Sequence, residues 1–518
     1  MALLHDLLRR AAERHPEQEL FVLRDRSLTY AEAATAASRL AGALAALGVR
    51  AGDRVALVLD NVPEYVIAYY GVLACGAAVV PLCPDTREAP LARALAHCEA
   101  RAVVISGKGS GLLTDAAAQL PALRLLLTVG TPLVAPTEGL AVHTLAEVLD
   151  AAPPLDGVRV DDGDLASIVY TSGTTAAPKG VMLSHRNVVS NTQSIVEYLG
   201  LVSTDRAALV LPLFYSYGNS VLHTHVAVGG TLVLLPSVAF PAAVLQGIQD
   251  HRCTGLPGVP STFARLLHST SFGSFDLSSL RYVTQAGGPM TPALADKLQR
   301  ALPHAQVYVM YGQTEAAPRL SYLPPADLRR KPGSVGIPIP GVRLAVMDDA
   351  GRVLPPNVVG ELVAQGENIM LGYWKDPEAT SQVLRPEGLR TGDLSRVDED
   401  GFFYIVGRNS DIIKSGAHRI SPQEIEEVVE RLPGVAQCAA VGIPDELLGE
   451  IIAVFVIRAP GAELTERDVA RSCFEQLPRF KVPAHVVFRE QLPRTESGKV
   501  QRAALKSWRP PAPPSPVA

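Results

Sequence analysis

The chain has 518 residues, of which 47% are hydrophobic and 19% are charged, and its formal net charge is −5. This length exceeds what one hydrophobic core usually supports, so two or three domains are expected. The nearly balanced charge argues against a protein that binds nucleic acid or an anionic membrane surface. The six cysteines include no Cys-x-x-Cys pair, which indicates neither a zinc site nor a disulfide framework.

No targeting or membrane segment is predicted. Residues 1–19 are typical of a charged amphipathic helix and lack the apolar core and cleavage site of a signal peptide. No stretch of about 18 uninterrupted apolar residues occurs, so no transmembrane helix is expected. These features together predict a cytoplasmic protein.

Strand-like and helix-like segments alternate over residues 53–340. The expected strands are 54–59, 102–106, 207–211, 231–235, 282–284 and 307–310. The expected helices, rich in alanine and leucine, include 31–46, 63–74 and 292–302. This alternation predicts parallel sheets that are covered by helices.

The pattern changes after about residue 341, where short strands and Gly/Asp/Pro turns predict a small antiparallel barrel or sheet. Beyond Arg408, capping boxes at Ser421-Pro-Gln-Glu424 and Thr465-Glu-Arg-Asp468 predict two helix starts, and a buried strand is expected at 451–457. The predicted fold class is therefore α/β, with three parts. They are an N-terminal domain (1–409) of parallel α/β sheets with a small β-barrel-like subdomain, an α+β C-terminal lid (410–508) and a disordered proline-rich tail (509–518).

The most informative stretch is Tyr170-Thr-Ser-Gly-Thr-Thr-Ala-Ala-Pro-Lys-Gly180, which follows an apolar run at 165–169. Glycine lets backbone N–H groups approach an anion closely, the hydroxyls add donors, and Lys179 adds a positive charge. These features favour a loop that binds polyphosphate over the alternative of a Thr/Gly-rich surface turn. It is not the Walker sequence, because no Gly-Lys-Ser/Thr ends it.

Four stretches downstream carry glycines and polar side chains suited to the same ligand. They are Gln285-Ala-Gly-Gly-Pro289, Val309-Met-Tyr-Gly-Gln-Thr-Glu315, Arg390-Thr-Gly-Asp393 with Arg408, and Pro493-Arg-Thr-Glu-Ser-Gly-Lys499. Each alone is also typical of an ordinary turn or a solvated surface. Together with the loop, and over residues 15 to 505, they resemble the adenylate-forming superfamily of acyl-CoA synthetases, peptide-synthetase adenylation domains and luciferases.

This resemblance implies a reaction in two steps and a set of residues for it. A carboxylic acid and ATP, with Mg²⁺, form an acyl-AMP, and coenzyme A then takes the acyl group while a mobile lid rotates between the steps. The implied catalytic residues are Lys499, Lys179, Thr314 and Glu315, and Glu315 is also the implied metal-associated residue. The implied ATP- and AMP-binding residues are Thr171, Ser172, Gly173, Thr174, Thr175, Gly287, Gly288, Pro289, Tyr311, Gly312, Gln313, Thr314, Asp393 and Arg408.

The resemblance also assigns a thiol tunnel to Ser415, Gly416 and Ala417 and a hinge to Ser410. Two positions depart from the family pattern. Ala176 stands where glycine is usual, and Ser410 stands where many relatives have Asp or Lys. Alanine fits the loop if its φ is negative, and serine can absorb a change of backbone conformation.

The acid pocket is expected at Phe214, Tyr215, Tyr217, Gly218, Gln285, Ala286, Gly287 and Met310. The stretch Phe-Tyr-Ser-Tyr-Gly at 214–218 is similar to one in bacterial benzoate-type ligases, and its three rings favour a compact aromatic acid such as benzoate or anthranilate. Core packing of the rings is the alternative interpretation, and a short or medium-chain fatty acid is the alternative substrate. No aspartate follows Phe214 to anchor an α-amine, which argues against an amino acid.

Coenzyme A is the expected thiol, because the insertion of fatty acyl-AMP ligases is not found. A carrier-protein phosphopantetheine offers the same thiol and stays open as an acceptor, and the oligomeric state stays open between monomer and homodimer. A degenerate relative that binds nucleotide without turnover is a third hypothesis. The chain argues against it, because it keeps all the residues that the reaction needs, namely Lys179, Glu315, Asp393, Arg408 and Lys499.

Overall fold

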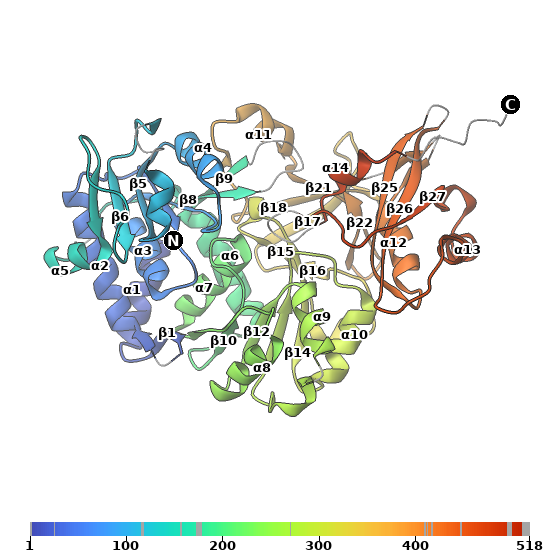
Figure 1. Cartoon of the computed structure of the whole chain (residues 1–518), viewed down its shortest axis with the longest axis horizontal. Coiled ribbons are helices and arrows are strands. Elements are labelled where there is room, and N and C mark those ends of the chain that lie inside the picture. The colour runs from blue at the N-terminus through green and yellow to red at the C-terminus, as the bar shows by residue number, and fades with distance from the viewer. Residues whose placement is uncertain are drawn as a thin grey trace. The chain divides into compact units, whose positions relative to one another are not determined.

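The computed structural model describes the chain from Leu3 to Arg509. It leaves out residues 25, 115–118, 156–157, 172–178, 270, 409–410, 412, 416–417, 446–447 and 495–499, and it describes only the backbone of 414, 418 and 419. The chain forms two compact units. The first comprises residues 1–171, 178–344 and 364–389, and the second comprises 172–177, 345–363 and 390–518 (Figure 1).

One sheet of the first unit has eight strands. Their order is β19 (Gly372–Tyr373), β9 (Lys179–Ser184), β8 (Leu165–Thr171), β4 (Ala78–Pro81), β3 (Arg54–Val58), β5 (Ala100–Ser106), β6 (Leu125–Val129) and β7 (Ala141–Thr144). Strands β8 to β7 pair in parallel, and β9 and β19 add an antiparallel edge. Its central strands β4, β3 and β5 are rich in Val and Ala and largely buried on both faces, as the sequence predicts.

The other sheet of the first unit has nine strands. Their order is β16 (Ile337–Pro338), β15 (Arg319–Leu323), β14 (Gln306–Gly312), β13 (Tyr282–Gln285), β12 (Gly255–Gly258), β10 (Arg206–Leu209), β11 (Thr231–Leu234), β1 (Glu19–Leu23) and β2 (Arg26–Thr29). Its central strands, β14 through β1, are parallel, and both edges are antiparallel. Parallel strands end at the same edge, so the segments that follow β13 and β14 lie side by side.

Helices surround both sheets, and α8, α9 and α10 lie beside β12 and β14 (Figure 1). They are α1 (Leu4–Arg14), α2 (Tyr30–Ala46), α3 (Pro63–Ala74), α4 (Glu88–Cys98), α5 (Leu145–Ala151), α6 (His185–Leu199), α7 (Ser216–Val228), α8 (Pro241–Asp250), α9 (Pro260–His268), α10 (Pro292–Ala301) and α11 (Pro377–Val383). The largest cluster of buried residues includes side chains from α1, α2, α3 and both sheets. Gly71 lets α2 and α3 pack closely, because a Cβ there would lie 2.9 Å from Leu40 Cβ.

Two smaller sheets follow along the chain. The first contains β17 (Val342–Met347), β18 (Gly360–Gly366), β21 (Gly388–Val397) and β20 (Leu384–Arg385), with β22 (Phe403–Arg408) paired to β21. The second contains β24 (His418–Ile420), β23 (Ile413–Ser415), β26 (Gly449–Arg458) and β25 (Val435–Asp445), with β27 (His485–Phe488) paired to β26. With the second belong α12 (Pro422–Glu430), α13 (Glu466–Gln476) and α14 (Arg502–Lys506).

The predicted fold class is confirmed, and the strands and helices expected after residue 30 occur within one or two residues of their predicted ends. The helix expected over residues 1–19 is shorter, because α1 ends at Arg14 and Glu19 begins β1. The capping box at Thr465 is also confirmed, because Thr465 and Asp468 exchange hydrogen bonds with each other's N–H groups. The capping box at Ser421 is wrong. Ser421 Oγ instead donates to the carbonyl of Val406, and Glu424 pairs with Lys481, so tertiary partners take both side chains away from the helix start.

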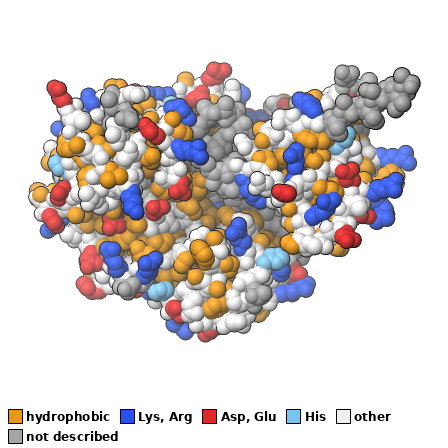
Figure 2. All heavy atoms as spheres, viewed as in Figure 1, with side chains coloured by type: hydrophobic (Ala, Val, Ile, Leu, Met, Phe, Trp, Pro, Cys, Tyr) orange, Lys and Arg blue, Asp and Glu red, His pale blue; other side chains and the backbone are white. Residues whose placement is uncertain are grey.

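Charged side chains of both signs are interspersed over the face drawn in Figure 2, in keeping with the small net charge. Within the part of the chain that the structure describes, none of the helices is long and apolar enough to cross a membrane. The domain boundary expected at 409–410 and the tail from 510 onward fall outside the described residues and stay predictions.

Candidate active site

The predicted polyphosphate loop connects β8 to β9. Thr171 at the end of β8 pairs across the hairpin with Lys179 at the start of β9. The hairpin therefore fixes the two described ends of the loop next to each other. The intervening residues, including Ser172, Gly173, Thr174 and Thr175, lie outside the described residues, so their role in phosphate binding stays a prediction.

Lys179 and Glu315 are brought together by a third residue, Tyr373. The ammonium of Lys179 lies over the ring of Tyr373, 4.8 Å from its centroid, which is a cation–π contact. The Tyr373 hydroxyl donates a hydrogen bond to Glu315 Oε1 at 2.9 Å. Burial, and then the negative charge of Glu315, raise the pKa of Tyr373, so the phenol stays protonated and able to donate.

Backbone pairing holds this arrangement in place. In β19, Tyr373 pairs with Val181 of β9, two residues after Lys179. The N–H of Met370 donates to the carbonyl oxygen of Glu315 at 2.9 Å. The cation and the carboxylate are therefore each tied to the segment that carries Tyr373.

The predicted stretch 309–315 runs off the carboxyl end of β14, where open α/β sheets bind their ligands. A Cβ on Gly312 would lie 2.0 Å from the carbonyl oxygen of Pro318, so only glycine fits at this turn. Beyond it, the hydroxyl of Thr314 lies 3.2 Å from that of Ser216 at the start of α7. Tyr311 and Gln313 are half-buried here, which leaves them partly open to a ligand.

The predicted stretch 285–289 follows the neighbouring strand, β13, in which Gln285 pairs with Val309 of β14. Gln285 is buried, and its Nε2 donates to the carbonyl of Gly288 at 2.8 Å, which stabilises the turn. Gly287 has a φ of +83°, a conformation that favours glycine. Pro289 ends the turn and is exposed. The two predicted nucleotide-binding stretches thus share one edge of the sheet.

A cavity with a free volume of about 20 Å³, room for one water molecule, lies between α6, α7 and strands β13 to β15. Tyr217 and Met310, both predicted for the acid pocket, line it, together with Thr284 and Arg319. The Tyr217 hydroxyl donates to the Thr284 carbonyl at 2.8 Å, which fixes the ring against β13.

The other residues predicted for the acid pocket do not line this cavity. They are Phe214, Tyr215, Gly218, Gln285, Ala286 and Gly287. The rings of Phe214 and Tyr215 are 4.4 Å apart in the segment that leads into α7. Gly218 permits that tight entry, because a Cβ there would lie 2.1 Å from the carbonyl oxygen of Pro212.

Asp393 and Arg408 are cross-strand partners in β21 and β22 of the second unit. Arg408 Nε donates to Asp393 Oδ1 at 3.1 Å, and Asp393 is buried while Arg408 is about half exposed. The pair is therefore a preformed ionic group in which the arginine is fixed by the aspartate. Whether it binds the ribose, as the resemblance implies, stays a prediction.

Part of the predicted lid chemistry falls on undescribed residues. Ser415 in β23 pairs with Gly449 of β26 and with His418 of β24. Gly416, Ala417, the hinge residue Ser410 and the catalytic candidate Lys499 lie outside the described residues. An isolated bridge between Arg494 and Val500 flanks the segment that contains Lys499.

Two residues at the site were missed from the sequence, Tyr373 and Arg319. Tyr373 carried no usable signal, because its role depends on strand pairing between segments that are far apart in the chain. Arg319 did carry a sequence signal, because it is a charged residue at the start of a buried strand. A charge in such a place is costly unless it has a partner or a function.

Comparison with known proteins gives matches over nearly the whole chain. Residues 8–374 match the AMP-binding enzyme family, and 424–499 match the C-terminal domain of AMP-binding enzymes. A feruloyl-CoA synthase from Amycolatopsis sp is 35% identical over 93% of this chain and 94% of its own length. A long-chain-fatty-acid–CoA ligase from Bacillus subtilis is 31% identical over 97% and 94%. The crystal structure of an anthranilate CoA ligase in complex with anthranoyl-AMP superposes with a TM-score of 0.89, at 28% identity over 98% of this chain and 97% of that one.

Proposed function

We propose, because this chain belongs to the family of AMP-binding enzymes, that it is an AMP-forming acid–thiol ligase. In the first step, a carboxylate oxygen of the acid attacks the α-phosphorus of ATP. The bond from that phosphorus to the bridging oxygen breaks, and pyrophosphate leaves. In the second step, the sulfur of coenzyme A attacks the acyl carbon of the acyl-AMP, and AMP leaves.

The arrangement of Lys179, Tyr373 and Glu315 is the observation that carries this proposal. In the described part of the chain, Lys179 contacts the Tyr373 ring and forms no ion pair, so its charge is available to the oxygens of a phosphate. Glu315 uses one oxygen to accept from Tyr373, which orients the other. A fixed cation beside an oriented carboxylate is suited to a triphosphate and the metal ion that accompanies it.

Mg²⁺ fits this set of residues. It prefers one or two carboxylates together with phosphate oxygens and water, and Glu315 supplies one carboxylate. The described residues hold no cluster of three His, Cys, Asp or Glu side chains, which suits an ion held mainly by its nucleotide. When bound, the ion neutralises phosphate charge.

The chain's own residues contribute positioning and electrostatic stabilisation. We infer that Lys179, with the hydroxyls of 171–175, holds the β- and γ-phosphates, and that Thr314 contacts the α-phosphate. Lys499 lies between the carboxylate and the α-phosphate during the first step. A hinge at Ser410 then lets the lid exchange Lys499 for the tunnel residues Ser415, Gly416 and Ala417.

The acid that this site takes is, in our proposal, compact and aromatic. The feruloyl-CoA synthase and the anthranilate CoA ligase support an aryl acid. The small cavity that Tyr217 lines also favours a compact substrate, and the Tyr217 ring is held in place to pack against another ring. The similarity to a long-chain-fatty-acid–CoA ligase makes a fatty acid the second candidate.

A panel of acids tests the function. The purified protein is given ATP, Mg²⁺ and coenzyme A with benzoate, anthranilate, ferulate, hexanoate or palmitate, and pyrophosphate and thioester are measured. We expect aryl thioesters to form with a larger kcat/KM than fatty acyl thioesters. No pyrophosphate with any acid would overturn the proposal, and a preference for palmitate would overturn the aryl assignment.

The acceptor is tested by replacing coenzyme A with a carrier protein that bears phosphopantetheine. We expect coenzyme A to be acylated, and acylation of the carrier alone would contradict its role as acceptor. A cytoplasmic location, where ATP and coenzyme A are abundant, accords with this proposal. Fractionation of cells that express the chain checks it.

A further inference from the structure

Arg319 is a buried charge without a counter-ion in the described structure. It begins β15, is 2% exposed, and lines the cavity next to Tyr217. Its Nε has no hydrogen-bond partner, and its guanidinium forms no ion pair with any carboxylate in the described residues. Burying a charge is costly, so an unpaired one at a ligand cavity is a candidate for ligand binding.

The position of Arg319 is fixed by its backbone. Its N–H donates to Asn191 Oδ1 at 3.2 Å, and its carbonyl accepts from Asn191 Nδ2 at 2.9 Å and from Asn368 Nδ2 at 3.0 Å. The guanidinium lies over the Tyr217 ring, 5.0 Å from its centroid, in a cation–π contact. The fold therefore holds the side chain at the cavity wall without using its five N–H donors for an ion pair.

Electrostatics agree with this placement. Burial raises the pKa of Tyr217 to about 12, and the positive charge of Arg319 opposes that rise. The same two causes act on Tyr198, whose hydroxyl lies 3.0 Å from Met310 Sδ at the cavity. The charge of Arg319 thus acts on the groups at the cavity wall.

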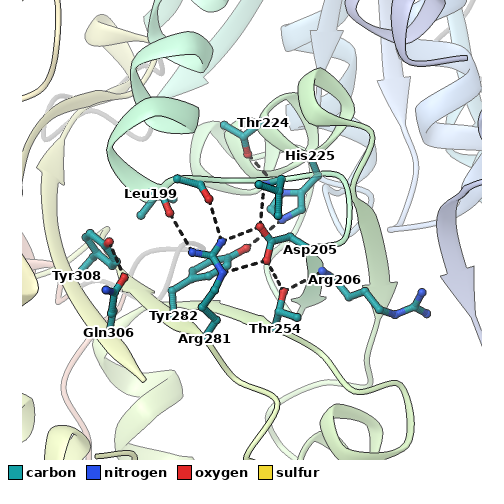
Figure 3. A network of polar contacts seen from close by, with 12 residues as sticks. Leu199, Asp205, Arg206, Thr224, His225, Thr254, Arg281, Tyr282, Gln306 and Tyr308 are labelled. Carbon is teal, nitrogen blue, oxygen red and sulfur yellow. Dashed lines mark hydrogen bonds and ion pairs between the residues drawn. The ribbon is translucent and has the colours of Figure 1, made fainter. Parts of the chain in front are cut away.

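Arg281, which lies nearby, shows how this fold treats a structural arginine. Its Nη2 donates to Asp205 Oδ2 at 2.6 Å, and its Nη1 donates to the carbonyl of Leu199 at 3.2 Å (Figure 3). Asp205 is itself buried and accepts further hydrogen bonds, including one from Thr254 at 2.7 Å. Arg319 has no such carboxylate partner in the described residues, and its guanidinium instead contacts the Tyr217 ring and hydrogen-bonds the Tyr198 hydroxyl.

We propose that Arg319 binds a second acidic group of the substrate, so that the preferred acid is a dicarboxylate whose second carboxylate is remote from the activated one. This inference rests on the proposed function and names its substrate class. A guanidinium and a carboxylate form two parallel hydrogen bonds, which neutral groups cannot match. The cavity of about 20 Å³ beside the guanidinium has room for one water molecule, which a carboxylate oxygen would displace.

Matched acids test this proposal. The kcat/KM for benzene-1,4-dicarboxylate is compared with that for benzoate, and hexanedioate is compared with hexanoate. We expect the dicarboxylate to be favoured by about tenfold or more, because acids without the second group leave the buried charge unpaired. In Arg319→Met, the ratio of kcat/KM for the dicarboxylate to kcat/KM for the matched monocarboxylate is expected to fall by about tenfold, mainly because the KM for the dicarboxylate rises.

Two further variants separate charge, geometry and folding. Arg319→Lys keeps the charge without the planar fork, so an intermediate ratio is expected. Arg343→Met removes an exposed arginine of β17 and is expected to keep the wild-type ratio. Equal losses with both acids in Arg319→Met, or no preference in the wild type, would overturn the proposal.

Calorimetric titration with benzene-1,4-dicarboxylate and with benzoate makes the test independent of turnover. We expect the wild type to bind the dicarboxylate more tightly, and Arg319→Met to lose that difference. If the enzyme releases no pyrophosphate but binds the dicarboxylate more tightly through Arg319, the proposed function is refuted and the role of Arg319 stands. If the enzyme turns over but binds both acids equally, the role of Arg319 is refuted and the proposed function stands.

Discussion

The hydroxyl of Tyr373 donates a hydrogen bond to the carboxylate of Glu315 at 2.9 Å, and the ammonium of Lys179 lies over the ring of the same tyrosine. One tyrosine therefore sets the position of both charges that the proposed reaction needs near ATP. The phenol orients the carboxylate, and the ring provides a surface for the cation.

Tyr373→Phe separates these two roles, because phenylalanine keeps the ring and removes the hydroxyl. The carboxylate of Glu315 then loses one oriented donor, a loss of about 1–3 kcal/mol where the group is buried. We expect pyrophosphate release to slow by about tenfold or more, with a smaller change in the KM for ATP. Steady-state kinetics over a range of ATP and Mg²⁺ concentrations measure both.

Tyr404→Phe is the matched control. Tyr404 also donates to a carboxylate, Asp398 Oδ2 at 3.2 Å, but it lies in the second unit and in none of the predicted nucleotide-binding stretches. We expect its kinetics to stay at the wild-type level. If both variants slow pyrophosphate release equally, the hydrogen bond to Glu315 has no special role.

Lys499→Ala is expected to abolish the first step and spare the second. Removing one charge contact from the developing phosphate charge costs roughly 10²–10³-fold in rate, by analogy with single oxyanion-hole donors. Pyrophosphate release from ATP and acid measures the first step, and thioester formation from synthetic acyl-AMP measures the second. Equal loss of both would contradict a lysine that serves one position of the lid.

The strands and the glycine-rich motifs were predictable because their signals are local. Runs such as β3 and β5 are continuous stretches of Val, Ala, Leu and Ile, and the turns after β13 and β14 carry their glycines within a few residues of the strand. Lys179 and Glu315 could be named for the same reason, since each ends a motif that lies in one segment.

The rest of the site depends on contacts between segments that are distant in sequence. Tyr373 is 58 residues from Glu315, and the pairing of β19 with β9 that brings it to Lys179 leaves no pattern in either segment. The capping box at Ser421 does not form for the same kind of reason, because the Ser421 hydroxyl donates to the carbonyl of Val406 instead. Tertiary partners override local preference in both cases.

Gly218→Ala is expected to destabilise the fold at the entry to α7. The added Cβ would lie 2.1 Å from the carbonyl oxygen of Pro212, and the backbone cannot move away as a flexible side chain can. Overpacking of this kind costs about 1–3 kcal/mol or more in the free energy of unfolding. Denaturant unfolding measures the change. Gly163→Ala, where a Cβ meets no atom within 4 Å, is the control and is expected to unfold like the wild type.

His223 makes stability depend on pH in a defined window. Burial lowers its pKa from 6.5 to about 3, and its Nδ1 lies 2.9 Å from the hydroxyl of Tyr70 in the core. Because the folded pKa lies below the unfolded one, the unfolded chain takes up a proton first as the pH falls. Titration of His223 therefore leaves the free energy of unfolding unchanged above about pH 6.5. Between pH 6.5 and about 3 it lowers the free energy of unfolding by up to about 1.4 kcal/mol per pH unit.

His223→Asn removes the titrating group from this position. We expect its free energy of unfolding to fall less steeply than that of the wild type between pH 7 and pH 5, although the variant is less stable at pH 7 because it loses packing in the core. His268→Asn, at an exposed position, is expected to keep the wild-type slope. Unfolding midpoints in urea across this range measure the slopes. Parallel curves for the wild type and His223→Asn would show that acid destabilises the fold through other groups.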